Sequence, residues 1–173
     1  FETEVRSLIK KYAKEHERII FNGDGYSEEW VVEAARRGLP NITNMVDTIE
    51  VLTKEKSVKL FERFGIFTKA ELESRAEILY ETYAKTINIE AKTMLAMAKQ
   101  QIIPAVIKFQ KNLAETTYFI YKTAGDSSVS TALLQDVTKL LNEAKKALDE
   151  LQKVTDTAAT LPEGKERAVY YRD

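Results

Sequence analysis

Hydrophobic residues recur at helical spacing along most of the chain, and one stretch dominates the pattern. From Phe67 to about Lys122 there is no Gly, and the only Pro is Pro104. The apolar positions that define this stretch are Leu72, Leu79, Tyr83, Ile87, Met94, Leu95 and Ile102. Their spacing predicts one long helix over about 69–122. If straight it would be about 80 Å long, whereas a compact domain of this size has a radius of gyration of about 16 Å. The helix must therefore break or find partners along its length.

The long helix begins with a strong start signal. Thr68 and Glu71 have the spacing of a capping box, and Phe67 is placed to pack on Leu72 as a hydrophobic staple. Pro104 lacks an amide hydrogen and clashes with the carbonyl four residues earlier. We therefore expect a kink there.

A second long helix is predicted to fold back along the first. It follows the Gly125 turn, begins at Asp126 or Ser128, and runs over about 128–154. A narrow apolar seam, typical of a coiled-coil partner, consists of Leu134, Val137, Leu141, Ala144, Leu148 and Leu151. A wider stripe, typical of bundle packing, adds Leu133, Leu140, Ala147 and Val154. This antiparallel helix would be about 40 Å long and would therefore return to the neighbourhood of residues 94–100.

The segments on either side of this hairpin are shorter. A loop is predicted over 155–160, with Pro162 in the first turn of a last helix. Upstream, amphipathic spacing predicts a helix over 2–17, and residues 18–21 form either its apolar end or a short strand. Ser27 is a good N-cap for a helix that Gly38 and Pro40 end. Further helices are expected from Asn44 and from about residue 54, the last ending at Gly65. The fold class is all-α, a helical bundle with an antiparallel hairpin. We expect segments 1–66 and 67–173 to form one compact unit.

Composition narrows the possible functions. With 44% hydrophobic residues the chain can bury a core. The net charge of −1 gives no electrostatic reason to expect nucleic-acid binding. No Cys is present, so disulfides, thiolate metal sites and cysteine nucleophiles are excluded. No signal peptide is visible, and no apolar run approaches the roughly 20 residues of a membrane span. Because neither end resembles a natural terminus, we expect a piece of a larger protein.

Candidate catalytic chemistry is sparse. His16 is the only histidine and has no partner for a metal site. Glu73, Glu77 and Glu81 share the spacing of di-iron helices, but the Glu-x-x-His elements of such sites are absent. We interpret these glutamates as a solvated face, and Glu90 as a partly buried residue with no assigned role. The sequence predicts no catalytic, cofactor-binding or metal-binding residue.

Two further features have alternative interpretations. The loop at residues 22–25 superficially suggests a phosphate or Ca²⁺ site, yet it lacks the spaced ligands of either, so a tight connection is favoured. Aromatic side chains gather towards the hairpin tip at Phe109, Tyr118, Phe119 and Tyr121. They are interpreted as packing, and exposure of these rings would instead indicate a partner surface.

Several motifs resemble type III glutamine synthetases. The most specific is the run from Arg18 to Trp30, which combines Phe-Asn-Gly, Tyr-Ser and Glu-Trp at fixed offsets. The resemblance continues through residues 33–41, Leu60-Phe61, Phe67 to Arg75, Tyr83 to Ala91, Ile103-Pro104-Ala105, and Tyr170 to Asp173. It covers most of the chain, although residues 127–160 match only as a helical arm.

The resemblance implies a large, oligomeric, cytoplasmic ligase that makes glutamine from glutamate, ammonia and ATP with Mg²⁺ or Mn²⁺. Segment 1–66 would then be the end of the catalytic region, and 67–173 a helical hairpin with the start of a final helix. Because the family's catalytic motifs lie upstream, we expect a non-catalytic C-terminal domain, inactive alone. Its partners would be the catalytic domain and other subunits, with no nucleic acid and no membrane. The alternatives are a free-standing helical interaction module and an enzyme using the carboxylates of the long helix.

Overall fold

The computed structural model describes residues 1–173 and contains only helices and their connections. The all-α prediction is therefore confirmed. In chain order the elements are α1 (Glu2–Glu15), the 3₁₀ turn η1 (Glu17–Ile19), α2 (Glu28–Arg36), α3 (Met45–Thr53), α4 (Glu55–Arg63), α5 (Lys69–Met97), the π-helical turn η2 (Ala98–Ile102), α6 (Ile103–Ala124), α7 (Ser128–Thr160) and α8 (Lys165–Arg172). The chain divides into two compact units, Phe1–Asp47 and Thr48–Asp173.

In the first unit the predicted boundaries of α2 are confirmed by its caps. The Ser27 side chain accepts a hydrogen bond from the Trp30 backbone at the start of α2. At its end Gly38 has φ +66°, and the Leu39 N–H donates to the Ala34 carbonyl. This is a Schellman motif, which satisfies carbonyls that the helix end would otherwise leave unpaired. No strand forms at residues 18–21, where η1 and a short extended segment follow α1.

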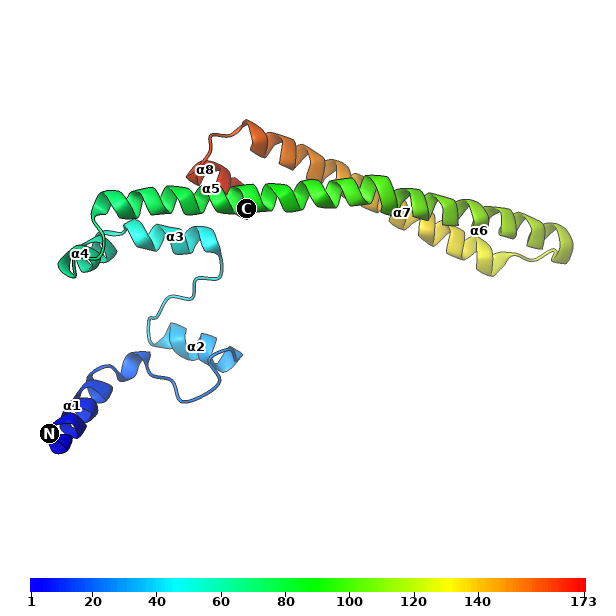
Figure 1. Ribbon diagram of the computed structural model, residues 1–173. Coiled ribbons are helices and arrows are strands. Elements are labelled where there is room, and N and C mark those ends of the chain that lie inside the picture. The colour runs from blue at the N-terminus through cyan, green and yellow to red at the C-terminus, as the bar shows by residue number, and fades with distance from the viewer. The chain divides into compact units, whose positions relative to one another are not determined.

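The second unit is organised by the long helix. The Thr68–Glu71 capping box is present, with both reciprocal hydrogen bonds formed. From this cap the helix continues without interruption through α5, η2 and α6 to Gly125, which has φ +77° (Figure 1). The distortion expected at Pro104 takes the form of η2. In a π-helical turn the hydrogen bonds span five residues, so the backbone changes register where Pro104 has no N–H to donate.

The return helix α7 confirms the predicted antiparallel hairpin. Lys99 Nζ lies 2.7 Å from Gln152 Oε1, and Gln110 Nε2 lies 2.6 Å from Thr138 Oγ1. Both pairs place α7 alongside η2 and α6, near the predicted position. The narrow seam is half-buried or buried except at Ala144, whereas Leu133, Leu140, Ala147 and Val154 of the wider stripe are exposed.

Two local predictions near the end of the chain were wrong. Residues 155–160 form the last turns of α7 rather than a loop, because Thr155 is buried and its hydroxyl donates to the Leu151 carbonyl. The last helix begins at Lys165 rather than at Pro162. It begins there because Gly164, with φ +94°, sets its first turn.

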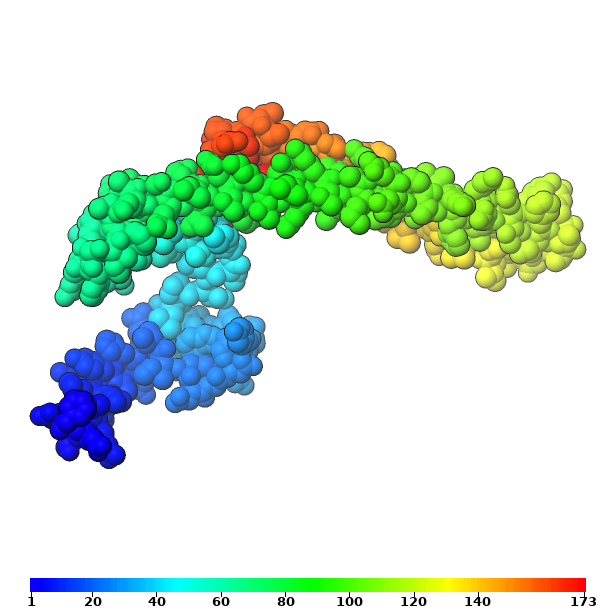
Figure 2. Space-filling model, in the orientation of Figure 1, coloured from blue at the N-terminus to red at the C-terminus, as the bar shows by residue number.

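The core of the second unit lies where α5 contacts α7 and α8. In Figure 2 the red α8 lies directly against the green α5. The buried residues of α5 are Leu72, Ala76, Tyr80, Ala84 and Leu95, and those of α7 and α8 are Leu148, Thr155, Ala158 and Ala168. The first four repeat every fourth residue, forming a ridge that fits the groove of a neighbouring helix. Many of these residues are alanines, which allow close approach. Met94 and Ile102, expected to face inward, are exposed.

Candidate functional site

The candidate catalytic residues do not converge. His16 ends α1, is exposed, and stacks on the Tyr12 ring with centroids 6.3 Å apart. Glu90 is exposed rather than partly buried. No group of three His, Cys, Asp or Glu side chains is arranged to hold a metal ion. The residues of this chain therefore do not fit the Mg²⁺ or Mn²⁺ that the resemblance implies.

The glutamates of α5 at positions 73, 77 and 81 each make a different contact. Glu73 pairs with Lys69 at 3.6 Å, and Glu81 with Lys85 at 3.0 Å. The hydrogen bond from Lys85 to Glu81 raises the pKa of the lysine. Glu77 instead reaches the start of α8, where its carboxylate lies beside Gly164. The interpretation as a solvated face holds for the two outer glutamates but misses the contact made by Glu77.

The loop at residues 22–25 uses its polar groups internally. Asp24 Oδ1 accepts the Tyr26 backbone N–H at 2.9 Å, and the Asp24 carbonyl accepts the Ser27 hydroxyl at 2.7 Å. A β-carbon at Gly23 would come within 2.7 Å of the Phe21 ring, so any other residue there would require the ring to shift. That ring packs on Trp30 with centroids 4.6 Å apart. These contacts are those of a tight connection between helices.

An arginine network in the first unit was not predicted from sequence. Arg37 donates to the Ile20 carbonyl at 2.6 Å, and Arg18 donates to the Arg37 carbonyl at 2.7 Å. Glu33 holds both Arg36 and Arg37. Hydrogen bonds from Arg36 and then Arg37 lower the pKa of Glu33 to about 2. The spacing of Glu33 from Arg36 and Arg37 was a signal for these ion pairs. The backbone carbonyls that Arg37 also contacts are revealed by no side-chain pattern.

A second missed feature is the polar anchoring of α8. Lys165 pairs with Glu50 of α3 at 2.5 Å, and this contact raises the pKa of Lys165. At the other end of α8 the Tyr171 hydroxyl donates to Asn88 of α5 at 3.1 Å. Burial raises the pKa of Tyr171. These contacts hold both ends of α8 and thereby position the base of the hairpin.

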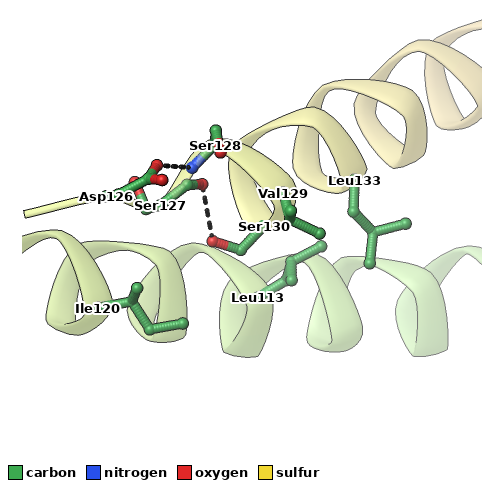
Figure 3. A pocket seen from close by; sticks show the side chains of 8 residues that line it. All are labelled: Leu113, Ile120, Asp126, Ser127, Ser128, Val129, Ser130 and Leu133. Carbon is green, nitrogen blue, oxygen red and sulfur yellow. Dashed lines mark hydrogen bonds between the residues drawn. The ribbon is translucent and has the colours of Figure 1, made fainter. Parts of the chain in front are cut away.

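The hairpin tip contains a shallow hollow of about 320 Å³. Val129 and Leu133 of α7 extend towards α6, which contributes Leu113 and Ile120 (Figure 3). At the loop, Asp126 Oδ1 accepts the Ser128 backbone N–H at 2.9 Å, and this hydrogen bond lowers the pKa of Asp126. The Asp126 carboxylate thus binds the backbone at the first residue of α7. The apolar side chains that line the hollow, such as Val129 and Leu133, remain exposed to solvent.

A second hollow of about 330 Å³ continues the apolar surface towards the base of the hairpin. It is lined by Ile102, Ile103, Val106, Phe109, Val137, Leu140, Leu141 and Ala144, with no charged residue. We give the name hairpin face to the apolar residues that line either hollow, apart from Ile103 and Leu141. They are Ile102, Val106, Phe109, Leu113 and Ile120 from η2 and α6, and Val129, Leu133, Val137, Leu140 and Ala144 from α7. Leu140 is 62% exposed and Phe109 is 50% exposed.

The remaining tip aromatics are also exposed. Tyr118, Phe119 and Tyr121 each keep more than half of their surface accessible, and Tyr118 meets Phe119 edge-on with centroids 5.6 Å apart. Interpretation of these rings as internal packing was wrong. Exposed rings are the outcome that the sequence analysis associated with a partner surface rather than with packing. None of the helices combines the length and the apolar character that crossing a membrane requires.

Comparisons with known proteins point to one family. The family model described as "Glutamine synthetase C-terminal domain" matches residues 4–120. A glutamine synthetase of Butyrivibrio fibrisolvens is 42% identical over 111 residues, which cover 64% of this chain and 16% of that protein. The type-3 glutamine synthetase of Dictyostelium discoideum is 40% identical over 115 residues, 66% of this chain and 16% of that protein. The match with a Bacteroides fragilis glutamine synthetase is 36% identical over 108 residues, 62% of this chain and 15% of that protein. The matched part thus spans about a sixth of each relative's length.

Proposed function

Because the chain belongs to the glutamine synthetase C-terminal domain family, we propose that it is the non-catalytic helical domain of such an enzyme. In this proposal it supports the catalytic domain and the assembly of subunits. The whole enzyme joins ammonia to glutamate with ATP and Mg²⁺ or Mn²⁺ in the cytoplasm, and these ligands bind outside the present chain. Its partners are the catalytic domain and further subunits, rather than nucleic acid or membrane.

The observation that supports an assembly role most strongly is the hairpin. Its base is fixed by α8 and its arms expose large apolar side chains, while acidic and histidine side chains form no metal-binding group. Exposed apolar surface of this extent marks a place where another protein surface is buried. A scaffold with such a surface fits assembly better than catalysis.

The test is to shorten the hairpin in the full-length enzyme. The Gln110–Thr138 hydrogen bond shows where the two arms are adjacent, so residues 111–137 can be replaced by a short Gly-Ser turn. This change leaves α5, α8 and the base of the hairpin in place. We expect the purified variant to form smaller assemblies in mass photometry and to make glutamine more slowly. Unchanged assembly size and unchanged glutamine formation would refute the proposal.

A second candidate function is a free-standing interaction module. The exposed tip aromatics Tyr118, Phe119 and Tyr121 favour it, because aromatic rings are enriched at protein interfaces. The complete reading frame discriminates between the two, since the leading proposal requires a catalytic region upstream. Glutamine formation by residues 1–173 alone would contradict both.

A further inference from the structure

The contact stripe of the long helix shifts by one residue at η2. On the base side of η2 the stripe passes through Ala91, Leu95 and Ala98, which are half-buried or buried. An unbroken α-helix would continue this stripe through Ile102, Ala105, Phe109, Asn112 and Thr116. All of these are exposed. The half-buried residues of α6 are instead Ile103, Val106, Gln110, Leu113 and Thr117.

The π-helical turn is the cause of this shift. The Ile103 N–H donates to the carbonyl of Ala98, five residues earlier, so the turn contains one residue more than an α-helical turn. Every later residue of the long helix is therefore displaced by one position around the helix axis. The residues of α6 that contact α7 each lie one position after those that an unbroken α-helix would present.

The partner helix α7 contains no such shift. It is a continuous α-helix over Ser128–Thr160. Its seam residues are half-buried or buried and follow one another every seventh position at Leu134, Leu141, Leu148 and Thr155. An uninterrupted seven-residue repeat is the pattern of a coiled-coil partner. The seam of α7 therefore contacts the long helix in one register at the base of the hairpin, and in another register along α6.

The unused stripe of α6 is also suited to this seam. Ile102 and Phe109 belong to the hairpin face, are 55% and 50% exposed, and line the same hollow between the long helix and α7. In the stripe that is used, the residues one position later are Ile103 and Gln110. Large apolar side chains are thus exposed directly beside a seam that could bury them. A step of one residue would exchange the two stripes.

Two local features hold α6 in the observed register. Gln110 Nε2 donates to the Thr138 hydroxyl at 2.6 Å, and a polar residue within an apolar seam fixes the register of two helices. Pro104 has no N–H, and in an α-helix its ring would clash with the carbonyl of Gln100. The wider turn of η2 lies immediately before Pro104, where this clash would occur. Each feature depends on a side chain that one substitution can remove.

We propose that η2 is a register switch for the hairpin. In its second state the π-helical turn closes to an α-helix, and α6 moves about 1.5 Å along α7 while turning by about 100° about its own axis. Phe109 then takes the place of Gln110 opposite Thr138. The exposed turn at Gly125 absorbs the movement, since even an added β-carbon there would meet no atom within 4 Å.

The switch goes beyond the proposed function and does not rest on it, because every contact involved lies within one chain. The contacts between α5 and α8 are the same in both states. The surface of the arm differs, because turning α6 moves exposed side chains such as Tyr118 and Tyr121 around the tip. A change confined to one turn of the long helix is thereby transmitted to the far end of the hairpin.

Disulfide trapping distinguishes the two registers. The chain has no Cys, so paired substitutions report only the intended contact. Gln110→Cys with Thr138→Cys should link rapidly in the observed register. Phe109→Cys with Thr138→Cys should link only in the second register, because Phe109 lines the hollow and Thr138 does not. Lys111→Cys with Thr138→Cys is the control, since position 111 is exposed and turned away from α7 in both registers.

The disulfides are measured in residues 1–173 by mass spectrometry after mild oxidation, and only links within a single chain are counted. Circular dichroism confirms that each variant stays helical. We expect the 109–138 pair to link completely but more slowly than the 110–138 pair, because the second register is reached by exchange from the first. No linking of the 109–138 pair, or linking no faster than that of the 111–138 control, overturns the inference.

Two changes near η2 should move the equilibrium in opposite directions. Pro104→Ala restores the N–H and removes the ring that opposes an α-helical turn, so the 109–138 pair should link roughly 10-fold faster. Deletion of Gln101 removes the extra residue and leaves α6 in its observed register within an unbroken α-helix. That variant should still link the cysteines placed at Gln110 and Thr138, but no longer those at Phe109 and Thr138. An unchanged 109–138 rate in either variant overturns the inference.

The deletion also has a readout that needs no cysteine. Removing one residue from an α-helix turns everything beyond it by about 100°. Deletion of the exposed Lys111 should therefore lower the melting temperature by roughly 5 °C or more, because Leu113 and Thr117 would leave the seam. Deletion of Gln101 should leave the melting temperature close to that of the wild type, since η2 already contains the extra residue. Equal losses for the two deletions overturn the inference.

Discussion

The carboxylate of Glu77 lies beside the α-carbon of Gly164, so that a β-carbon there would come within 2.7 Å of Glu77 Oε2. Glu77 belongs to α5, and Gly164 precedes the first residue of α8. The backbone N–H groups at a helix start carry partial positive charge, which favours a nearby carboxylate. This contact, together with the Lys165–Glu50 pair, sets where the last helix begins.

Gly164→Ala should destabilise the chain by about 1–3 kcal/mol, because φ +94° is strained for any residue with a β-carbon. Urea unfolding followed by circular dichroism measures the loss. The same substitution in a Glu77→Ala background separates strain from steric conflict. An equal loss in both backgrounds identifies backbone strain. If the loss of stability disappears in the Glu77→Ala background, its cause is the steric conflict with Glu77, and the prediction of backbone strain is wrong.

Leu141→Asp should destabilise the hairpin far more than Leu140→Asp. Leu141 lies in the half-buried seam, where a carboxylate would lose its hydration, and we expect a loss of about 2–4 kcal/mol. Leu140 is exposed, so the same change one residue earlier should cost about 0.5 kcal/mol or less. Thermal unfolding at a concentration low enough to keep the chain monomeric gives the comparison. Equal melting temperatures would mean that the seam has been assigned to the wrong face.

The Glu33 network should make the first unit sensitive to acid. Because the folded pKa of Glu33, about 2, lies below its usual value of 4.5, the carboxylate stabilises the fold at neutral pH. That stabilisation begins to fall below about pH 4.5 and is lost as the pH reaches about 2.

Trp30, the only tryptophan, packs on Phe21 and reports unfolding of this unit by fluorescence. Glu33→Gln should lower stability at pH 7 and flatten its dependence between about pH 5 and 2. Glu29→Gln, on the same helix and without an ion pair, is the control. Parallel pH profiles for wild type and Glu33→Gln would refute the assignment.

The hydrogen bond from Tyr171 to Asn88 should couple α8 to α5. Tyr171→Phe and Asn88→Ala should each cost about 1 kcal/mol, and a double-mutant cycle should show a coupling of about 0.5–1.5 kcal/mol. The pKa of Tyr171 is raised by burial from its usual value of 10.0, so its contribution is full below that value and falls as the pH rises through the folded pKa. Strict additivity of the two substitutions would show that the contact contributes nothing.

Local signals in the sequence predicted most helix boundaries. Ser27, Thr68 with Glu71, and the glycines at positions 38, 65 and 125 act through backbone hydrogen bonds or positive φ that depend only on nearby residues. Long-range packing was harder to predict. Thr155 and its neighbours favour a loop by composition, but burial of Thr155 against the core keeps them helical.

The face used by the long helix was also only partly predictable. Apolar periodicity selected Leu79 and Met94, whereas the buried ridge contains Ala76, Tyr80 and Ala84. Alanine side chains contribute little to the hydrophobic periodicity of a sequence. Their role in packing becomes evident only when another helix approaches closely. Leu133 and Leu140 of the hairpin face were visible in the wider stripe of α7, but only the structure showed that they stay exposed.

The uninterrupted helix from Lys69 to Ala124 behaves mechanically as a lever. Its base is held by α8 through Glu77, Asn88 and their partners, and its tip lies about 80 Å from the Thr68 cap. Ala124 lies about 54 Å along the helix from Asn88, so a rotation of about 5° there would carry the tip through roughly 5 Å. Sub-ångström adjustments where α8 seats on α5 are therefore magnified into movements as large as a side chain at the far end.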